Sequence, residues 1–126
     1  MKATNTTVTY PIDTTMSNID NHTCPILYAL QIIGQKWKLP ILWYLHEQKN
    51  TRYNELKRRI PGITNIMLTK SLRELESADL VYRNVYETIP PKVEYGLTTT
   101  GQELLPTLNE LYKWGEMQMK NQDKAK

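Results

Sequence analysis

The sequence is poor in the residues that build metal centres and disulfide frameworks. Its 126 residues include one cysteine, Cys24, and two histidines, His22 and His46. A single cysteine cannot form an internal disulfide, and a zinc quartet would need more cysteine and histidine ligands than the chain holds. We therefore predict no metal site and no cofactor, and a reducing compartment.

Long apolar runs and phosphate-binding loops are also missing. No run approaches the length of a membrane span, and residues 1–20 are rich in threonine and asparagine where a signal peptide would be apolar. There is no glycine-rich phosphate loop, and neither histidine has a neighbouring nucleophile or carboxylate motif. These absences predict a cytoplasmic protein that makes no membrane contact, has no catalytic residues and is not an enzyme.

The composition, 40% hydrophobic and 23% charged, is that of one small globular domain. A net charge of +3 favours an anionic partner without identifying it. Residues 1–21 are polar and aperiodic, so we expect a flexible arm there, a folded domain over residues 22–121 and a polar tail over residues 122–126.

The clearest helical pattern lies within residues 61–80. Leucines recur there at i, i+4 and i+7, as Leu68, Leu72 and Leu75. This spacing predicts an amphipathic helix that buries its leucines, with Thr64 as its N-cap and Ala78-Asp79 at its end.

Basic side chains lie opposite the leucines. Lys70 and Arg73 fall on that outer face, and the cluster at residues 57–59 ends a preceding helix expected over residues 51–60. The pair resembles a helix-turn-helix, in which one helix approaches phosphates and the next reads bases. The alternative is a solvated helix surface, because lysine and arginine opposite a leucine stripe are common.

Other segments complete the pattern. Helices are expected over residues 25–33, 37–47 and 101–121, the last capped by Thr99 or Thr100. The first of these is apolar almost all round, and the last carries two apolar stripes. A second subunit is expected to cover this surplus apolar surface, so we predict a homodimer formed through the first and last helices.

A β-hairpin is expected between the central and last helices. Residues 81–87 and 93–98 are rich in β-branched and aromatic side chains, and two prolines lie in the connection. We expect these prolines to project Lys92 and Arg83 beyond the strands. The predicted fold is mainly α with a small β-hairpin (α+β), a winged helix-turn-helix.

Several segments closely resemble the HxlR-type winged-helix transcriptional regulators of bacteria. They are CPILYALQIIGQKW, RYNELKRRIPGIT, MLTKSLRELE, IPPKVEYGLT and TGQELLPTLNELYKWG. The resemblance runs from Cys24 to Gly115 and implies a homodimer on double-stranded DNA, with a recognition helix in the major groove and a wing at the minor groove or backbone. Ile66, Ser71 and Gly96 depart from the family pattern, which bears on base preference and not on the mode of binding.

The candidate DNA-binding residues fall into two sets. Those suited to the groove are Thr64, Asn65, Ile66, Thr69, Lys70 and Arg73. Those suited to phosphates alone are Arg52, Lys57, Arg58, Arg59, Arg83 and Lys92. Two alternatives stay open: Thr64 acts only as a cap, and Arg73 pairs with Glu76 along the helix.

Cys24 precedes Pro25 at a helix start, where unpaired N–H groups stabilise a thiolate. Some regulators of the family that this chain resembles use a cysteine at this position to sense quinones, other electrophiles or oxidants. We therefore predict a sequence-specific transcriptional regulator that binds an inverted repeat as a homodimer and senses redox or electrophile chemistry through Cys24. The alternatives are a structural Cys24 in a regulator of a non-covalent ligand, and a winged-helix protein-interaction module.

Overall fold

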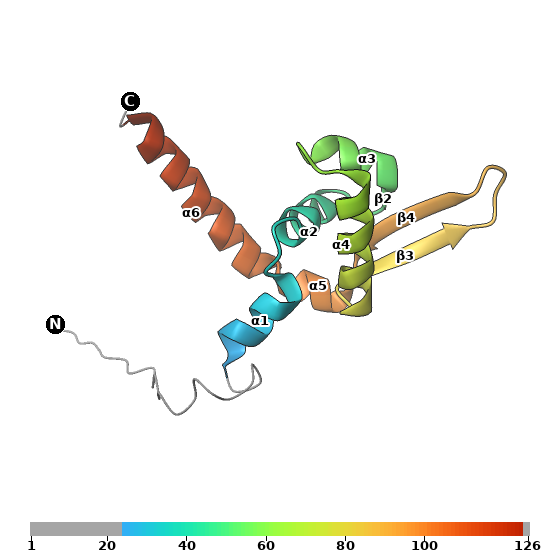
Figure 1. The fold of residues 1–126 in the computed structure, drawn as a ribbon, viewed down its shortest axis with the longest axis horizontal. Coiled ribbons are helices and arrows are strands. Elements are labelled where there is room, and N and C mark those ends of the chain that lie inside the picture. The colour runs from blue at the N-terminus through green and yellow to red at the C-terminus, as the bar shows by residue number, and fades with distance from the viewer. Residues whose placement is uncertain (1–23, 125–126) are drawn as a thin grey trace. The chain divides into compact units, whose positions relative to one another are not determined.

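The computed structural model describes residues 24–124. Its helices are α1 (Pro25–Ile33), α2 (Lys38–Glu47), α3 (Tyr53–Arg59), α4 (Asn65–Ser77), α5 (Thr99–Glu103) and α6 (Leu105–Lys124). Its strands are β2 (Thr51–Arg52), β3 (Val81–Tyr86) and β4 (Lys92–Leu97) (Figure 1). This architecture confirms the predicted fold class, mainly α with a small antiparallel sheet. The expected arm, residues 1–21, lies outside the described residues.

The chain divides into two compact units, one up to Gln31 and one from Ile32 onward. In the first, the Tyr28 amide donates to the Cys24 carbonyl at 2.9 Å, which makes Cys24 the N-cap of α1. None of the residues of α1 is buried, and Ile26 is 69% exposed. The prediction of a short helix with uncovered apolar surface is therefore confirmed.

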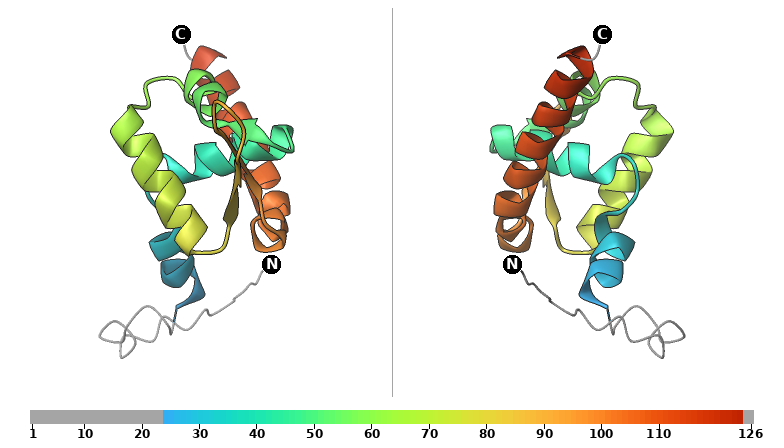
Figure 2. Two further views of the ribbon diagram at one scale, coloured as in Figure 1. Left: turned by 90° about the vertical axis from the view of Figure 1, so that its right-hand side faces the viewer. Right: turned by 90° about the vertical axis from the view of Figure 1, so that its left-hand side faces the viewer.

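The core of the second unit forms around α2, which lies between α4 and α6 in both views of Figure 2. The residues of α4 that reach this core are the predicted leucines, Leu68, Leu72 and Leu75. An ion contact adds to this packing, because Nζ of the buried Lys38 lies 3.0 Å from Oε1 of Glu74. Together these contacts hold α4 against α2.

The sheet has one strand more than expected. The helix predicted from residue 51 is wrong at its start, because Thr51 and Arg52 form β2 and α3 begins at Tyr53. The strand order is β2-β4-β3, and Thr51 pairs with Tyr95. The free edge of β4 provides hydrogen-bonding groups that a local pattern does not show, and the β-branched Thr51 suits an extended backbone.

The register of the wing places two predicted side chains differently. Lys92 pairs with Tyr86 and Arg83 pairs with Tyr95, so both lie within the strands. The prediction that the prolines project them beyond the strands is therefore wrong. The connection between the strands is formed instead by residues 87–91, which include Glu87 and the fully exposed Ile89.

Gly96 does not interrupt its strand. It pairs with Tyr82, and a Cβ at this position would overlap the Tyr82 ring. The Tyr82 hydroxyl donates to the turn after α2, where Asn50 Oδ1 and the Lys49 carbonyl lie. Burial, followed by the nearby Tyr86 and Glu94, raises the pKa of Tyr82 above its ordinary value. Glycine here makes room for the contact that joins the wing to α2.

The single long helix predicted over residues 101–121 is wrong, since the chain breaks at Leu104 into α5 and α6. Pro106 has no N–H to donate to the Gln102 carbonyl four residues before it, and its ring disfavours a continuous helix. The cap is also earlier than expected: Thr98 Oγ1, and not Thr99 or Thr100, accepts the Gly101 N–H at 3.0 Å.

The packing of α6 does not separate its two predicted apolar stripes, because each stripe has both packed and exposed members. Leu108 is buried, and the Tyr112 ring stacks on Trp43 of α2 with centroids 4.7 Å apart. Large side chains further along α6 remain exposed: Leu111, Trp114, Met117 and Met119. Part of α6 therefore packs on its own domain, and part presents uncovered apolar surface. Among the described helices, none is both long and apolar enough to span a bilayer.

Candidate nucleic-acid interface

The turns before and after α4 fix where the helix begins and where it ends. Gly62 adopts a φ of 85° in the turn before the helix, and Thr64 Oγ1 accepts the Met67 N–H at 3.1 Å. At the other end Asp79 adopts a φ of 63°, which ends the helix after Ala78. The predicted N-cap and helix end are both confirmed.

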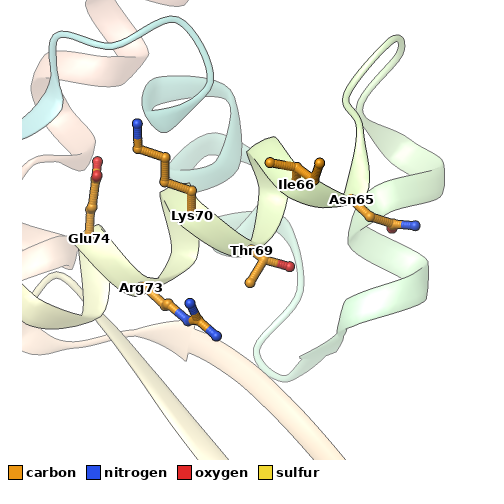
Figure 3. A pocket seen from close by; sticks show the side chains of 6 residues that line it. All are labelled: Asn65, Ile66, Thr69, Lys70, Arg73 and Glu74. Carbon is orange, nitrogen blue, oxygen red and sulfur yellow. The ribbon is translucent and has the colours of Figure 1, made fainter.

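The exposed side of α4 carries two parallel rows of side chains (Figure 3). One row is Asn65, Thr69 and Arg73, and the other is Ile66, Lys70 and Glu74; all six line one shallow depression. Members of each row are four residues apart, the spacing at which helical side chains lie one above another. The structure thus brings together every groove candidate except Thr64, and adds Glu74.

Two of the departures from the family pattern are now placed. Ile66 is 78% exposed and belongs to the outer face. Ser71 is 3% exposed and lies among the residues that α4 buries. Only Ile66 can therefore influence a contact made by the exposed rows.

A tyrosine of α3 reaches the first of these rows. The Tyr53 hydroxyl lies 3.2 Å from Asn65 Oδ1, 3.1 Å from the Asn65 carbonyl oxygen and 3.0 Å from Thr69 Oγ1. Tyr53 is not among the predicted site residues, because its contact depends on the angle between α3 and α4 and not on spacing along one helix.

Arg73 also faces the wing. It lines a second depression with Arg83 of β3, Tyr95 of β4 and Glu76. No ion pair joins Arg73 to Glu76 within residues 24–124, so the alternative of an intrahelical pair is not what the structure shows. Two arginines from separate elements are thereby placed on the same side of the domain.

A model of HxlR-like helix-turn-helix proteins matches residues 32–123. The chain belongs to the HxlR-like helix-turn-helix family. The regulatory protein MalR of Fusobacterium mortiferum is 44% identical over 97 residues, which cover 77% of this chain and 92% of MalR. An HTH-type transcriptional regulator of Methanothermobacter thermautotrophicus is 44% identical over 84% of this chain and 80% of its own length.

Solved structures resemble this HxlR-like protein as well. The redox regulator HypR in its oxidized form is 44% identical, with a TM-score of 0.71 over 75% of this chain and 96% of HypR. The reduced form of the transcriptional regulator YodB from B. subtilis is 33% identical, with a TM-score of 0.64 over 74% of this chain and 91% of YodB. The predicted family is confirmed: the relatives are helix-turn-helix transcriptional regulators, which are not enzymes.

The phosphate-contact candidates of this HxlR-like protein differ in whether a carboxylate lies within ion-pair distance of the side chain. Arg59 lies 2.7 Å from Glu47, and Lys92 lies 3.3 Å from Glu94. Of the other four phosphate candidates, three are exposed and belong to none of the ion pairs found among the described residues: Arg52, Arg58 and Arg83. The fourth, Lys57, is partly buried. A carboxylate already neutralises Arg59 and Lys92, so these two have the least charge to offer another anion.

Cys24 lies in the first unit, half-buried at the N-cap of α1. Within residues 24–124, no group of three or more His, Cys, Asp or Glu side chains is placed to hold a metal ion.

The cap at Thr64 can be tested by stability. Thr64→Ala should lower the free energy of unfolding by about 1 kcal/mol, because it removes the acceptor of the Met67 N–H, and Thr64→Ser should restore most of that loss. Urea denaturation at fixed protein concentration measures both. Thr99→Ala, at an exposed threonine that is not a cap, is the control; equal losses at both sites would contradict the assignment.

Proposed function

We propose that this HxlR-like protein is a sequence-specific transcriptional regulator that binds double-stranded DNA as a homodimer. The observation that carries the proposal is the exposed side of α4, where two rows of side chains project from a helix whose other side is fixed in the core. Amide, hydroxyl, apolar and cationic groups together are the kinds that read base edges in a major groove.

The two candidate sets are assigned different tasks. Asn65, Ile66 and Thr69 are proposed to contact base edges, and Lys70 and Arg73 to contact guanine or phosphate. Thr64 keeps its place as the cap, beside the phosphates. The cations proposed to lie along the phosphate backbone are Arg52, Lys57, Arg58, Arg59, Arg83 and Lys92.

The proposed homodimer rests on apolar surface that the chain leaves uncovered. Ile26 and Leu30 of α1 are exposed, as are Trp114 and Met117 of α6. Exposed apolar side chains that recur along one helix favour an interaction site, and a second copy of the chain has the matching composition. A two-fold symmetric dimer would present two copies of α4 to an inverted repeat.

Selection from a random duplex library tests this function. The enriched sites should be inverted repeats whose half-sites lie one helical turn, or a multiple, apart, and sedimentation at micromolar concentration should give twice the chain mass of 14.8 kDa. Lys70→Glu with Arg73→Glu should abolish enrichment and leave the sedimentation unchanged. A monomer, or a library without an enriched motif, would refute the proposal.

The state of each cation predicts its contribution to salt dependence. Arg58→Ala should weaken binding to all sequences alike and reduce the slope of log affinity against log salt by about 1. Lys92→Ala and Arg59→Ala should change the slope less, because Glu94 and Glu47 already neutralise these side chains. Fluorescence anisotropy over a series of salt concentrations measures the slopes, and an equal change in all three variants would contradict this ranking.

Cys24 is proposed to couple oxidants or electrophiles to DNA release. Two observations support this: the structural relative HypR is a redox regulator, and Cys24 caps the apolar helix assigned to the dimer. The chain has one cysteine, so a disulfide would join two subunits or one subunit and a small thiol, and in either case each thiol gives one proton and one electron to the oxidant. With a quinone, the sulfur would add to a ring carbon, the thiol proton would pass to the quinone and a hydroquinone thioether would result.

Titration of operator binding with diamide and with a quinone tests this role. Wild type should lose affinity, Cys24→Ser should keep it, and a reductant should restore the diamide-treated wild type but not the quinone adduct. Non-reducing electrophoresis should show the crosslinked dimer in wild type only. Equal loss of binding in the two proteins, or none in either, would leave Cys24 with a structural role.

A further inference from the structure

We propose that Tyr53 sets the base preference of α4 by fixing how Asn65 and Thr69 present their polar groups. The inference rests on the proposed function, since it assumes that α4 reads DNA. Tyr53 itself is a positioning residue on α3, where it lies beside the row formed by Asn65, Thr69 and Arg73.

Contacts with the hydrophobic core hold the Tyr53 ring in place. It is partly buried and packs against the hydrophobic core, so its hydroxyl has little freedom to follow α4. From this position the oxygen lies 3.0–3.2 Å from three oxygen atoms, two on Asn65 and one on Thr69. An oxygen anchored by the core therefore meets the polar groups of two adjacent turns of α4.

The proposal requires one arrangement of the protons in this cluster. A tyrosine hydroxyl has one proton to donate and lone pairs to accept. Both Asn65 oxygens can only accept, so the Tyr53 proton is directed to Asn65. Only the Thr69 hydroxyl can donate to the Tyr53 oxygen in return, and it lies 3.0 Å away. With the Tyr53 proton directed to Asn65, the proposal requires the Thr69 hydroxyl to donate toward α3 and not toward the groove.

For Asn65 this arrangement leaves the amide nitrogen outermost, as Figure 3 shows. Asparagine recognises adenine with both ends of its amide, accepting from N6 and donating to N7. With Oδ1 engaged by Tyr53, Asn65 presents mainly donors, which suit the acceptors O6 and N7 of guanine or O4 of thymine. We infer a preference for a keto base, guanine or thymine, opposite Asn65.

For Thr69 the arrangement leaves the methyl group, and not the hydroxyl, free to contact a base. Its oxygen faces Tyr53, and Figure 3 shows its methyl group directed to the other side. A methyl group in the major groove contacts the C5-methyl of thymine. The Thr69 hydroxyl thus contributes orientation, and its methyl contributes the contact.

Tyr53→Phe tests the proposal on the operator obtained by selection, because it removes the hydroxyl and keeps the ring in the core. Preference for a keto base over adenine at the position opposite Asn65 should fall about 2- to 10-fold. Affinity for unrelated DNA and the salt slope should not change. Competition binding with each base substitution measures the preference, and circular dichroism verifies the fold.

Three further variants separate positioning from other roles. In an Asn65→Ala background, Tyr53→Phe should have little further effect on preference at that position, because its action passes through Asn65. Thr69→Val keeps the shape and a methyl group, so it should retain thymine recognition. Tyr82→Phe also removes a tyrosine hydroxyl, but one that is bonded to the turn after α2, and it should leave the preference unchanged.

The outcomes are distinguishable. If wild type selects no motif, the proposed function fails. If wild type selects a motif and Tyr53→Phe leaves its preference unchanged, or weakens operator and unrelated DNA equally, the role of Tyr53 is refuted and the function survives. A loss of thymine recognition in Thr69→Val would show that the Thr69 hydroxyl reads the base directly, and would also overturn the assignment.

Discussion

The rotation of α4 about its own axis is the constraint on which the rest of the domain depends. Three leucines bury one side of the helix against α2, and the Lys38–Glu74 contact holds the same two helices together. Since successive residues turn by about 100°, burying one side decides which residues face outward. A slip by one residue would place other side chains on the exposed face and break the leucine packing, so core stability and the identity of the exposed rows are set by the same contacts.

The charges of the domain are distributed unevenly around this helix. Carboxylates lie next to Lys92 on the wing and next to Arg59 on α3, whereas Lys70 and Arg73 on α4 have none in ion-pair distance among the described residues. On the wing, the charge of Lys92 is compensated, and Arg83 is an exposed cation outside the ion pairs of the described residues. Uncompensated positive charge is found on α4 and at neighbouring exposed arginines such as Arg58.

Local patterns were enough to predict much of this architecture. The period of Leu68, Leu72 and Leu75, the cap at Thr64 and the β-branched run from Val81 all depend on neighbours within a few residues, and all were predicted.

The errors concern partners that are distant in sequence. The pairing of Thr51 with Tyr95, the register of Lys92 and the reach of Tyr53 to Asn65 depend on how elements meet in space. The break at Leu104 is an exception, because its cause, Pro106, lies two residues away in the sequence.

The length of the exposed rows limits how much sequence one copy of this protein can distinguish. From Asn65 to Arg73 the helix advances about 12 Å at 1.5 Å per residue. At about 3.4 Å per base pair, that stretch faces roughly four base pairs. Four base pairs recur far too often to mark one place among the 10⁶ or so competing sites of a small genome. Selectivity in the cell is therefore a property of how many copies of α4 are joined at a defined separation, and the apolar surfaces of α1 and α6 bear on it as directly as any residue facing a base.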